Sequence, residues 1–180
     1  MAYENKTGLP SVTQVIRPYI DTDWFLPEHA ARGTAVHGAM KAYLLGAWSP
    51  PLKAEYQPYF ASGKRWVDLM VDKVIAVEKR MIHSAMGYCG KPDLVCTLKG
   101  ETVSSIIDFK TSQAKANWHP LQIAAYQELS EYDSHIATHR GMTVRLLVDG
   151  SMAQADEHYG RAQVMNIFIG LLNAWKYFNK

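Results

Sequence analysis

The chain has 180 residues, of which 48% are hydrophobic and 20% charged, and its formal net charge is +2. This length and composition are typical of one globular domain with a full core, and the sequence contains no low-complexity tract or internal repeat. A charge this small neither favours nor excludes nucleic-acid binding, because an acidic metal site would mask a basic surround in the total.

Nothing in the sequence predicts a membrane-spanning or secreted protein. No apolar run is long enough to cross a bilayer, and the N-terminal stretch MAYENKTGLPS has neither the basic nor the apolar region of a signal peptide. The two cysteines, Cys89 and Cys96, are too few for a four-cysteine zinc or iron–sulfur site and could form at most one disulfide. We therefore expect a soluble, cytoplasmic protein.

The first part of the chain predicts helices. Pro10 and the capping residue Ser11 predict a short helix over 10–20, which Pro18 limits. Two further helices are expected over 27–46 and 55–72.

The middle of the chain changes to strands. Three segments rich in β-forming residues follow one another, and Lys99-Gly100 is a tight-turn signal between the last two, so we expect an antiparallel meander. A helix, a strand bounded by glycines and an amphipathic helix complete the chain. The strands are expected over 73–82, 88–98, 102–110 and 141–150, and the helices over 119–132 and 162–178.

This order of elements predicts an α+β fold, with a central mixed β-sheet that contains the meander and is flanked by helices. We expect one domain over 1–180. It would consist of a mainly helical part (1–72), a sheet with its following helix (73–150) and a closing helix (151–180).

Acidic residues lie where two strands of the meander should meet. Asp108 and Lys110 share one face at the end of strand 102–110, which begins apolar on both faces and should therefore be an inner strand. Asp93 begins the preceding strand, so an antiparallel hairpin brings it beside them. Two carboxylates at that separation repel each other, and a hard divalent cation such as Mg²⁺ removes the conflict. The alternative is a turn residue next to a surface ion pair.

Five motifs in order resemble the PD-(D/E)XK nuclease superfamily, and more closely its RecB-like and phage exonuclease branch. The resemblance covers roughly residues 11–150. The motifs are RGTAVH (32–37), VEKRMIHSAMGYCGKPD (77–93), the catalytic pair GKPDLV and IIDFKTS, the ending FKTS (109–112), and QIAAY (122–126). The resemblance implies a restriction-endonuclease-like core and hydrolysis of phosphodiester bonds in DNA.

The resemblance also implies roles for single residues. Asp93, Asp108 and Lys110 correspond to the catalytic residues, and the metal ligands would be Asp93 and Asp108 with His37 and the backbone carbonyl of Phe109. Lys110 would orient or activate the attacking water. A histidine on a helix face is the alternative for His37.

Four other residues are candidates for holding DNA or positioning the site: Thr111, Ser112, Gln122 and Tyr126. The last two lie four apart on one helix face, and we expect the opposite face, with Leu121, Ala125 and Leu129, to pack on the sheet. A solvent-facing glutamine and a half-buried tyrosine are the alternative.

Two further residues stay open. Glu78 is a possible outer-shell residue, a surface charge or the partner of an arginine. Trp118 could stack on a base or anchor the helix.

The expected cofactor is Mg²⁺ or Mn²⁺, as one ion or two, and no iron–sulfur cluster is expected because relatives that hold one use four cysteines. The expected partner is DNA. No P-loop is present, so any helicase would be a separate chain, as would a recombination or single-strand-binding protein. The alternatives are a structure-specific endonuclease or junction resolvase, and an inactive relative that only binds nucleic acid.

Overall fold

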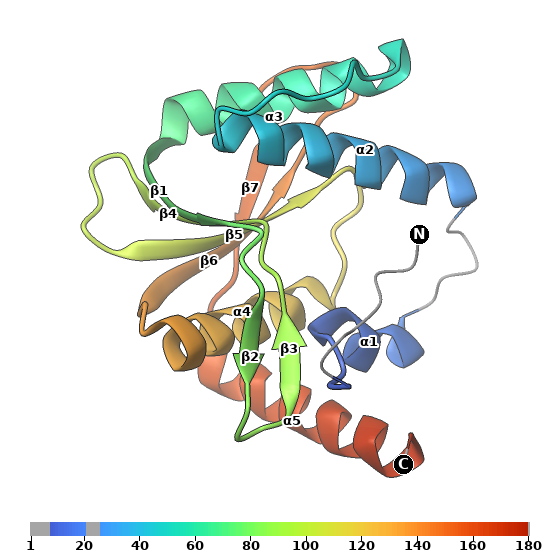
Figure 1. The fold of residues 1–180 in the computed structure, drawn as a ribbon, viewed down its shortest axis with the longest axis vertical. Coiled ribbons are helices and arrows are strands. Elements are labelled where there is room, and N and C mark those ends of the chain that lie inside the picture. Colours follow the sequence, from blue (N-terminus) through green and yellow to red (C-terminus); the bar gives the residue numbers. More distant parts are fainter. Residues whose placement is uncertain (1–7, 21–25, 180) are drawn as a thin grey trace.

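A five-stranded mixed sheet with helices on both faces forms the centre of the protein (Figure 1). The computed structural model describes residues 8–20 and 26–179, so the stretch 1–7, on which the expectation about a signal peptide depends, lies outside the described residues. No helix in this part of the chain is both long and apolar enough to cross a membrane. The strands, in their order across the sheet, are β1 (Val71–Val77), β4 (Leu94–Leu98), β5 (Ser104–Lys110), β6 (Thr138–Arg145) and β7 (Gln154–Glu157).

The sheet combines an antiparallel meander with one parallel pair. Strands β1, β4 and β5 pair antiparallel in turn, β5 and β6 run parallel, and β6 and β7 are antiparallel. The predicted α+β class with a central mixed sheet is therefore confirmed. Strand β5 is an inner strand, with Ile106 and Ile107 fully buried on its two faces.

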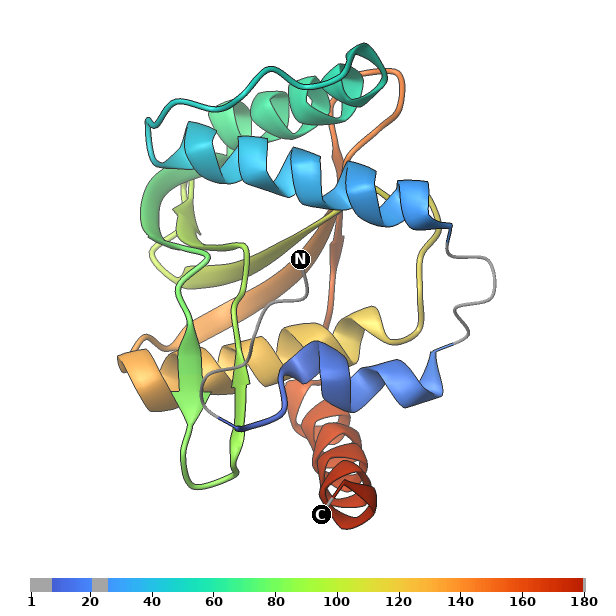
Figure 2. The same cartoon turned by 45° about the vertical axis from the view of Figure 1, so that its right-hand side comes forward.

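The helices form one layer on each face (Figures 1 and 2). Helices α2 (Pro27–Leu44) and α3 (Gln57–Met70) cover one face, where Phe109 meets Trp66 edge-on with ring centroids 6.4 Å apart. The other face is covered by α1 (Val12–Ile16), α4 (His119–Ser134) and α5 (Arg161–Phe178). The end of β5 thus lies between two hydrophobic cores, one on each side of the sheet.

The first helix begins where the sequence predicts. Ser11 accepts a hydrogen bond from the Gln14 backbone at 3.2 Å, and the Gln14 side chain accepts one from the Ser11 backbone at 2.9 Å. This reciprocal capping satisfies N–H groups at the helix start. A 3-10 turn over Arg17–Tyr19, which contains Pro18, extends α1, and a second turn over Ala54–Tyr56 precedes α3.

The strands expected over 73–82 and 88–98 are both interrupted, and this corrects the prediction. Glu78 has a φ of 44°, which no strand residue adopts, and it ends β1. Pro92, which has no N–H to donate, lies in the corresponding break before β4. Beyond the breaks the chain forms a separate hairpin of β2 (Met81–His83) and β3 (Tyr88–Gly90).

The expected strand over 141–150 is displaced, because β6 begins at Thr138 and ends at Arg145. Gly141 lies inside the strand and does not bound it. The position requires a glycine, because a side chain there would overlap the Ile123 Cγ2 methyl of α4. Strand β7 was not predicted. Its sequence QADE has no apolar alternation, and main-chain pairing with β6 at the sheet edge holds it in place.

Candidate active site

Two carboxylates meet at the end of the central strand. Leu94 of β4 pairs with Ile107 of β5, so Asp93 and Asp108, one residue further, lie side by side. Asp93 Oδ2 accepts a hydrogen bond from the backbone N–H of Phe109 at 2.7 Å. Phe109 therefore contributes its N–H to this contact, whereas the sequence-based expectation concerned its carbonyl.

Helix α2 delivers His37 to this pair of carboxylates. His37 Nδ1 donates to Asp93 Oδ1 at 3.1 Å. Gly33, one turn earlier, lies close to Thr111 just after β5, where an added Cβ would be 3.9 Å from Thr111 Oγ1. Burial alone would lower the pKa of His37, but the charge and hydrogen bond of Asp93 outweigh it and raise the pKa to about 9. His37 is therefore protonated at neutral pH in this arrangement and forms an ion pair with Asp93.

Lys110 is held by three groups. Its Nζ lies 2.5 Å from Asp108 Oδ2, donates to Gln122 Oε1 at 2.7 Å, and lies 4.8 Å from the centroid of the Trp118 ring. A carboxylate, an amide oxygen and an aromatic face all favour a positive charge at this position. The ammonium group is thereby fixed in direction at the mouth of the carboxylate pair.

Gln122 and Tyr126 lie behind Lys110. Gln122 Nε2 donates to Tyr126 Oη at 3.1 Å. Both residues are buried, at 6% and 5% exposure, so the alternative of a solvent-facing glutamine does not hold. Thr111 is buried and Ser112 half-buried, directly after β5.

The expectation that Leu121, Ala125 and Leu129 form a face opposite Gln122 and Tyr126 is wrong for Leu129. Ala125 and Leu129 are buried, but so are Gln122 and Tyr126. Tyr126 and Leu129 even share a side of the helix, because a Cβ at Gly90 would meet both side chains within 3 Å. Helix α4 contacts the sheet, α1, α5 and the β2–β3 hairpin, so Gln122 and Tyr126 are covered although they are polar.

The pKa values of the two carboxylates are shifted in opposite directions. Burial raises the pKa of Asp108, and the neighbouring Asp93 charge adds to this, more than Lys110 lowers it. Burial acts on Asp93 in the same direction, but His37 and the Phe109 N–H outweigh it and lower the pKa of Asp93. Environments that shift the pKa values of two neighbouring groups in opposite directions are typical of sites that carry out acid–base or metal chemistry.

Glu78 adds a third carboxylate near Asp93. Its Oε2 accepts hydrogen bonds from Lys41 at 3.1 Å and from Lys91 at 2.6 Å. Its positive φ is a strained conformation for glutamate and costs on the order of 1–3 kcal/mol. Half-exposed ion pairs contribute about 0–1 kcal/mol each, which does not clearly offset that cost. A strained residue in this position is a candidate functional residue.

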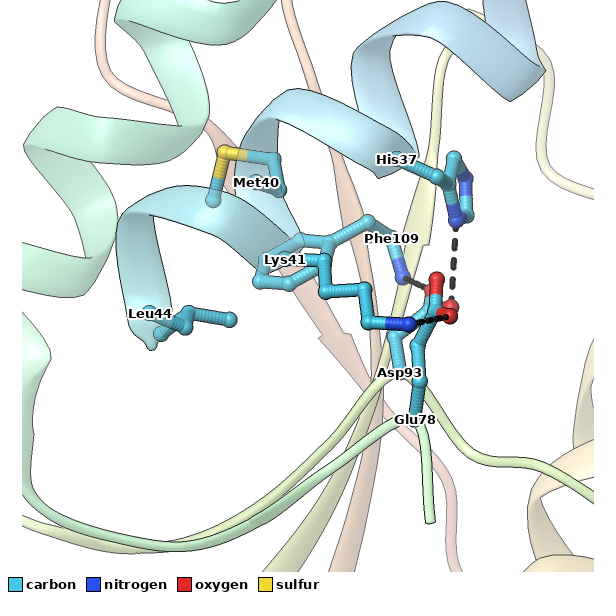
Figure 3. Close-up of a pocket in the computed structure, with 7 residues that line it drawn as sticks. All are labelled: His37, Met40, Lys41, Leu44, Glu78, Asp93 and Phe109. Carbon is cyan, nitrogen blue, oxygen red and sulfur yellow. Dashed lines mark hydrogen bonds and ion pairs between the residues drawn. The ribbon is translucent and has the colours of Figure 1, made fainter. Parts of the chain in front are cut away.

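A narrow pocket lies beside these groups (Figure 3). Its volume is ≈ 10 Å³, about the room that one water molecule or ion needs. It is lined by His37, Met40, Lys41, Leu44, Glu78, Asp93 and Phe109. Figure 3 shows the His37 and Lys41 side chains pointing from α2 toward the carboxylates of Asp93 and Glu78.

The donor set suits a hard divalent cation in part. Asp108 Oδ2 is buried and accepts no hydrogen bond within the described residues, although it contacts Lys110. Within residues 8–20 and 26–179, no group of three or more His, Cys, Asp or Glu side chains is arranged to hold a metal ion. Mg²⁺ does not need such a group, because it is commonly held by one or two carboxylates together with substrate phosphate oxygens. Asp93 and Asp108 fit that role, whereas His37 here is the partner of Asp93.

No protein-family profile and no curated protein matches the sequence. The structure is similar to three solved structures. SSO0001 is 16% identical with a TM-score of 0.44, covering 91% of this chain and 72% of its own. LHK-Exo in complex with dAMP is 12% identical with a TM-score of 0.44, covering 94% and 87%. An alkaline exonuclease (LHK-Exo) from Laribacter hongkongensis is 13% identical with a TM-score of 0.39, covering 96% and 92%. At these low TM-scores, the likenesses carry no argument about activity.

Sequence reasoning missed two lysines and left one aromatic open. Lys41 lies four residues after His37 on α2 and therefore on the same helix face, a signal that could have identified it. Lys91 precedes Asp93 by two residues, but only the break between β3 and β4 brings it to Glu78. Trp118, for which base stacking and anchoring were both open, contacts Lys110.

Proposed function

We propose that the chain is a divalent-metal-dependent DNA nuclease of the PD-(D/E)XK superfamily, acting as an exonuclease in DNA recombination, repair or phage DNA processing. The observation that carries this proposal is a pair of adjacent carboxylates, the half-buried Asp93 and the buried Asp108, beside a lysine whose direction three neighbours fix. The five sequence motifs support the superfamily and the exonuclease branch.

Each residue has a distinct part in the proposed reaction. A bound Mg²⁺ or Mn²⁺ would neutralise phosphate charge and acidify a water. Asp93 and Asp108 hold the cation, and His37 orients the Asp93 carboxylate through its Nδ1 bond. Lys110 orients the attacking water and stabilises negative charge that develops on the phosphate. Gln122 and Tyr126 keep Lys110 in place.

The proposal is tested with end-labelled linear DNA next to closed circular DNA. We expect Mg²⁺ or Mn²⁺ to support release of mononucleotides from the linear substrate while the circle stays intact. Ca²⁺ should support binding with little turnover, because it is larger and positions ligands less strictly. Full activity in excess chelator would contradict metal dependence, and linearised circles would favour the endonuclease or resolvase alternative.

Asp108→Asn is the matched inactive control. The amide keeps the size of the buried side chain but provides no negative charge, so we expect the fold to persist. Loss of several kcal/mol of charge stabilisation corresponds to at least about 10³-fold in rate. A folded Asp108→Asn variant with near-normal cleavage would remove Asp108 from the site. A wild type that binds DNA but does not cleave it with any of the divalent ions would be an inactive relative.

A further inference from the structure

We infer that Lys41 and Lys91 form a binding site for a nucleic-acid backbone phosphate next to the one that is cleaved, and that the Glu78 carboxylate occupies this site in the free protein. This inference rests on the proposed function and adds residues that recognise the substrate.

The two lysines converge from separate elements on one oxygen atom. Lys41 comes from α2 and Lys91 from the segment between β3 and β4, and both donate to Glu78 Oε2, at 3.1 and 2.6 Å. The two ammonium groups share this one carboxylate oxygen. The Lys41 and Lys91 side chains are 45% and 39% exposed, whereas Glu78 is 13% exposed. The positive groups therefore face the side from which a large polyanion can approach.

The carboxylate between them is held in place by the backbone. The Glu78 N–H donates to the carbonyl oxygen of Asp93 at 3.0 Å, and this contact joins the end of β1 to the start of β4. The left-handed conformation of Glu78 turns its side chain toward the pocket that Asp93 and His37 also line (Figure 3). The residue with the strained backbone, Glu78, is therefore the one that positions the two lysines.

The spacing on α2 suits two neighbouring phosphates of one strand. Lys41 follows His37 by four residues, which is about 6 Å along the helix axis at 1.5 Å per residue. That distance is comparable with the separation of adjacent phosphate groups in a nucleic-acid strand. A phosphate at the carboxylate pair would thus leave the next one within reach of Lys41 and Lys91.

An anionic phosphate can replace the Glu78 carboxylate as partner of the lysines. Both are oxygen acceptors for ammonium groups, and each lysine is exposed enough to turn toward the new partner. In the free protein, Glu78 thus occupies the site and prevents the two like charges from separating. With DNA bound, the same carboxylate would stay nearby and limit how tightly the strand is held.

The test measures binding without cleavage. Affinity for a fluorescein-labelled oligodeoxythymidylate is measured by anisotropy in excess chelator, at salt concentrations between about 50 and 200 mM. The test variant is Lys41→Gln with Lys91→Gln, and the matched control is Lys53→Gln with Lys73→Gln, two exposed lysines outside the pocket. Melting curves show whether all variants fold.

For single strands, each phosphate contact contributes about 0.7 to the slope of log affinity against log salt. Because the two lysines are proposed to bind a single phosphate, we expect the Lys41/Lys91 variant to lose about 0.7 from that slope and the control pair to keep it. Glu78→Gln removes a competing negative charge and should bind a few-fold more tightly than the wild type. An unchanged slope in the folded Lys41/Lys91 variant overturns the inference, and weaker binding by Glu78→Gln overturns the role of Glu78.

This readout separates the inference from the proposed function. A wild type that hydrolyses DNA, with an unchanged slope in the lysine variant, keeps the nuclease and removes the phosphate site. A wild type without hydrolysis, with a reduced slope in the variant, removes the nuclease and keeps a nucleic-acid contact at Lys41 and Lys91.

Discussion

Helices α2 and α4 reach the same end of β5 from opposite faces of the sheet, but they differ in burial. Of the 18 residues of α2 only four are buried, and its site residues His37 and Lys41 remain partly or largely exposed. Of the 16 residues of α4 nine are buried, including Gln122 and Tyr126. A substitution on α4 therefore changes packing and the site together, whereas one on α2 can change the site alone.

The largest effect that tests this comparison is expected where α4 meets β5. Lys110→Ala removes the group that Gln122 holds, and we expect cleavage to fall by at least about 10²-fold, the scale of a positioned proton-transfer group. Single-turnover rates of the folded fraction measure it. Lys115→Ala is the control, because Lys115 is a 69% exposed lysine that pairs with Asp156. Equal rates for the two variants would show that Lys110 has only a structural role.

Two glycine substitutions test the difference in packing directly. Gly141→Ala places a methyl against Ile123 of α4, and overpacking of this kind costs about 1–3 kcal/mol. Gly38→Ala on α2 meets nothing within 4 Å and should stabilise the exposed helix by about 0.5–1 kcal/mol. Urea unfolding measures both free energies. A shift in the same direction for both variants would show that the two helices are packed alike.

The pH dependence of stability should report the buried start of α4. Burial, aided by the positive charge of Lys110, lowers the pKa of His119 to about 3, against 6.5 in the unfolded chain. A lowered pKa means that the unfolded state takes up a proton first. The contribution of His119 to the free energy of unfolding is therefore complete above pH 6.5 and falls by up to about 1.4 kcal/mol per pH unit below it.

In His119→Asn, one proton fewer is taken up on unfolding. The slope of unfolding free energy against pH should therefore be smaller by up to about 1.4 kcal/mol per pH unit between pH 6.5 and 5. The variant keeps part of the slope, because burial also lowers the pKa of His83 and His158. Unfolding free energies from urea titrations at several pH values give the slope. Identical slopes for the variant and the wild type would show that His119 is protonated in the folded protein.

The smallest effect is expected from Gln122→Ala. Asp108 and Trp118 still hold the Lys110 ammonium group in this variant. Loss of its hydrogen bond to Gln122 should therefore reduce the cleavage rate by only about 2- to 10-fold, or about 0.5–1.5 kcal/mol. Since Gln122 is buried, the melting temperature of the variant should fall as well. Gln127→Ala is the control, because Gln127 is buried on the same helix but bonds to the Thr138 carbonyl. It should melt lower and cleave normally once folded, and a reduced rate would show a general packing effect.

The parts of the fold that depend on local signals could be predicted. The turn at Lys99-Gly100, where Gly100 has a φ of 79°, sets the hairpin that brings Asp93 beside Asp108. The capping of Ser11 and the position of Pro27 in the first turn of α2 likewise act within a few residues. These features need no knowledge of the rest of the chain.

The parts of the fold and of the site that depend on contacts between distant residues could not be predicted from the sequence. The left-handed conformation of Glu78 depends on Asp93 and two lysines from other elements, and glutamate has no intrinsic preference for it. Strand β7 forms because β6 offers it an open edge, although its side chains show no strand pattern. The separation of α4 into a polar and an apolar face was predicted wrongly, because Gln122 and Tyr126 are buried as well as Leu129.

The two outer strands of the sheet have a consequence for how the protein behaves at high concentration. Strand β1 is irregular, with register shifts on either side of Lys73 and Val74, and exposes Asp72 and Lys73. Strand β7 is only four residues long, and its Asp156 is paired with Arg145 at 2.6 Å. Short, bulged and charged strands are poor templates for a strand of another molecule. We therefore expect both edges of the sheet to resist strand pairing between copies of the protein, and hence aggregation.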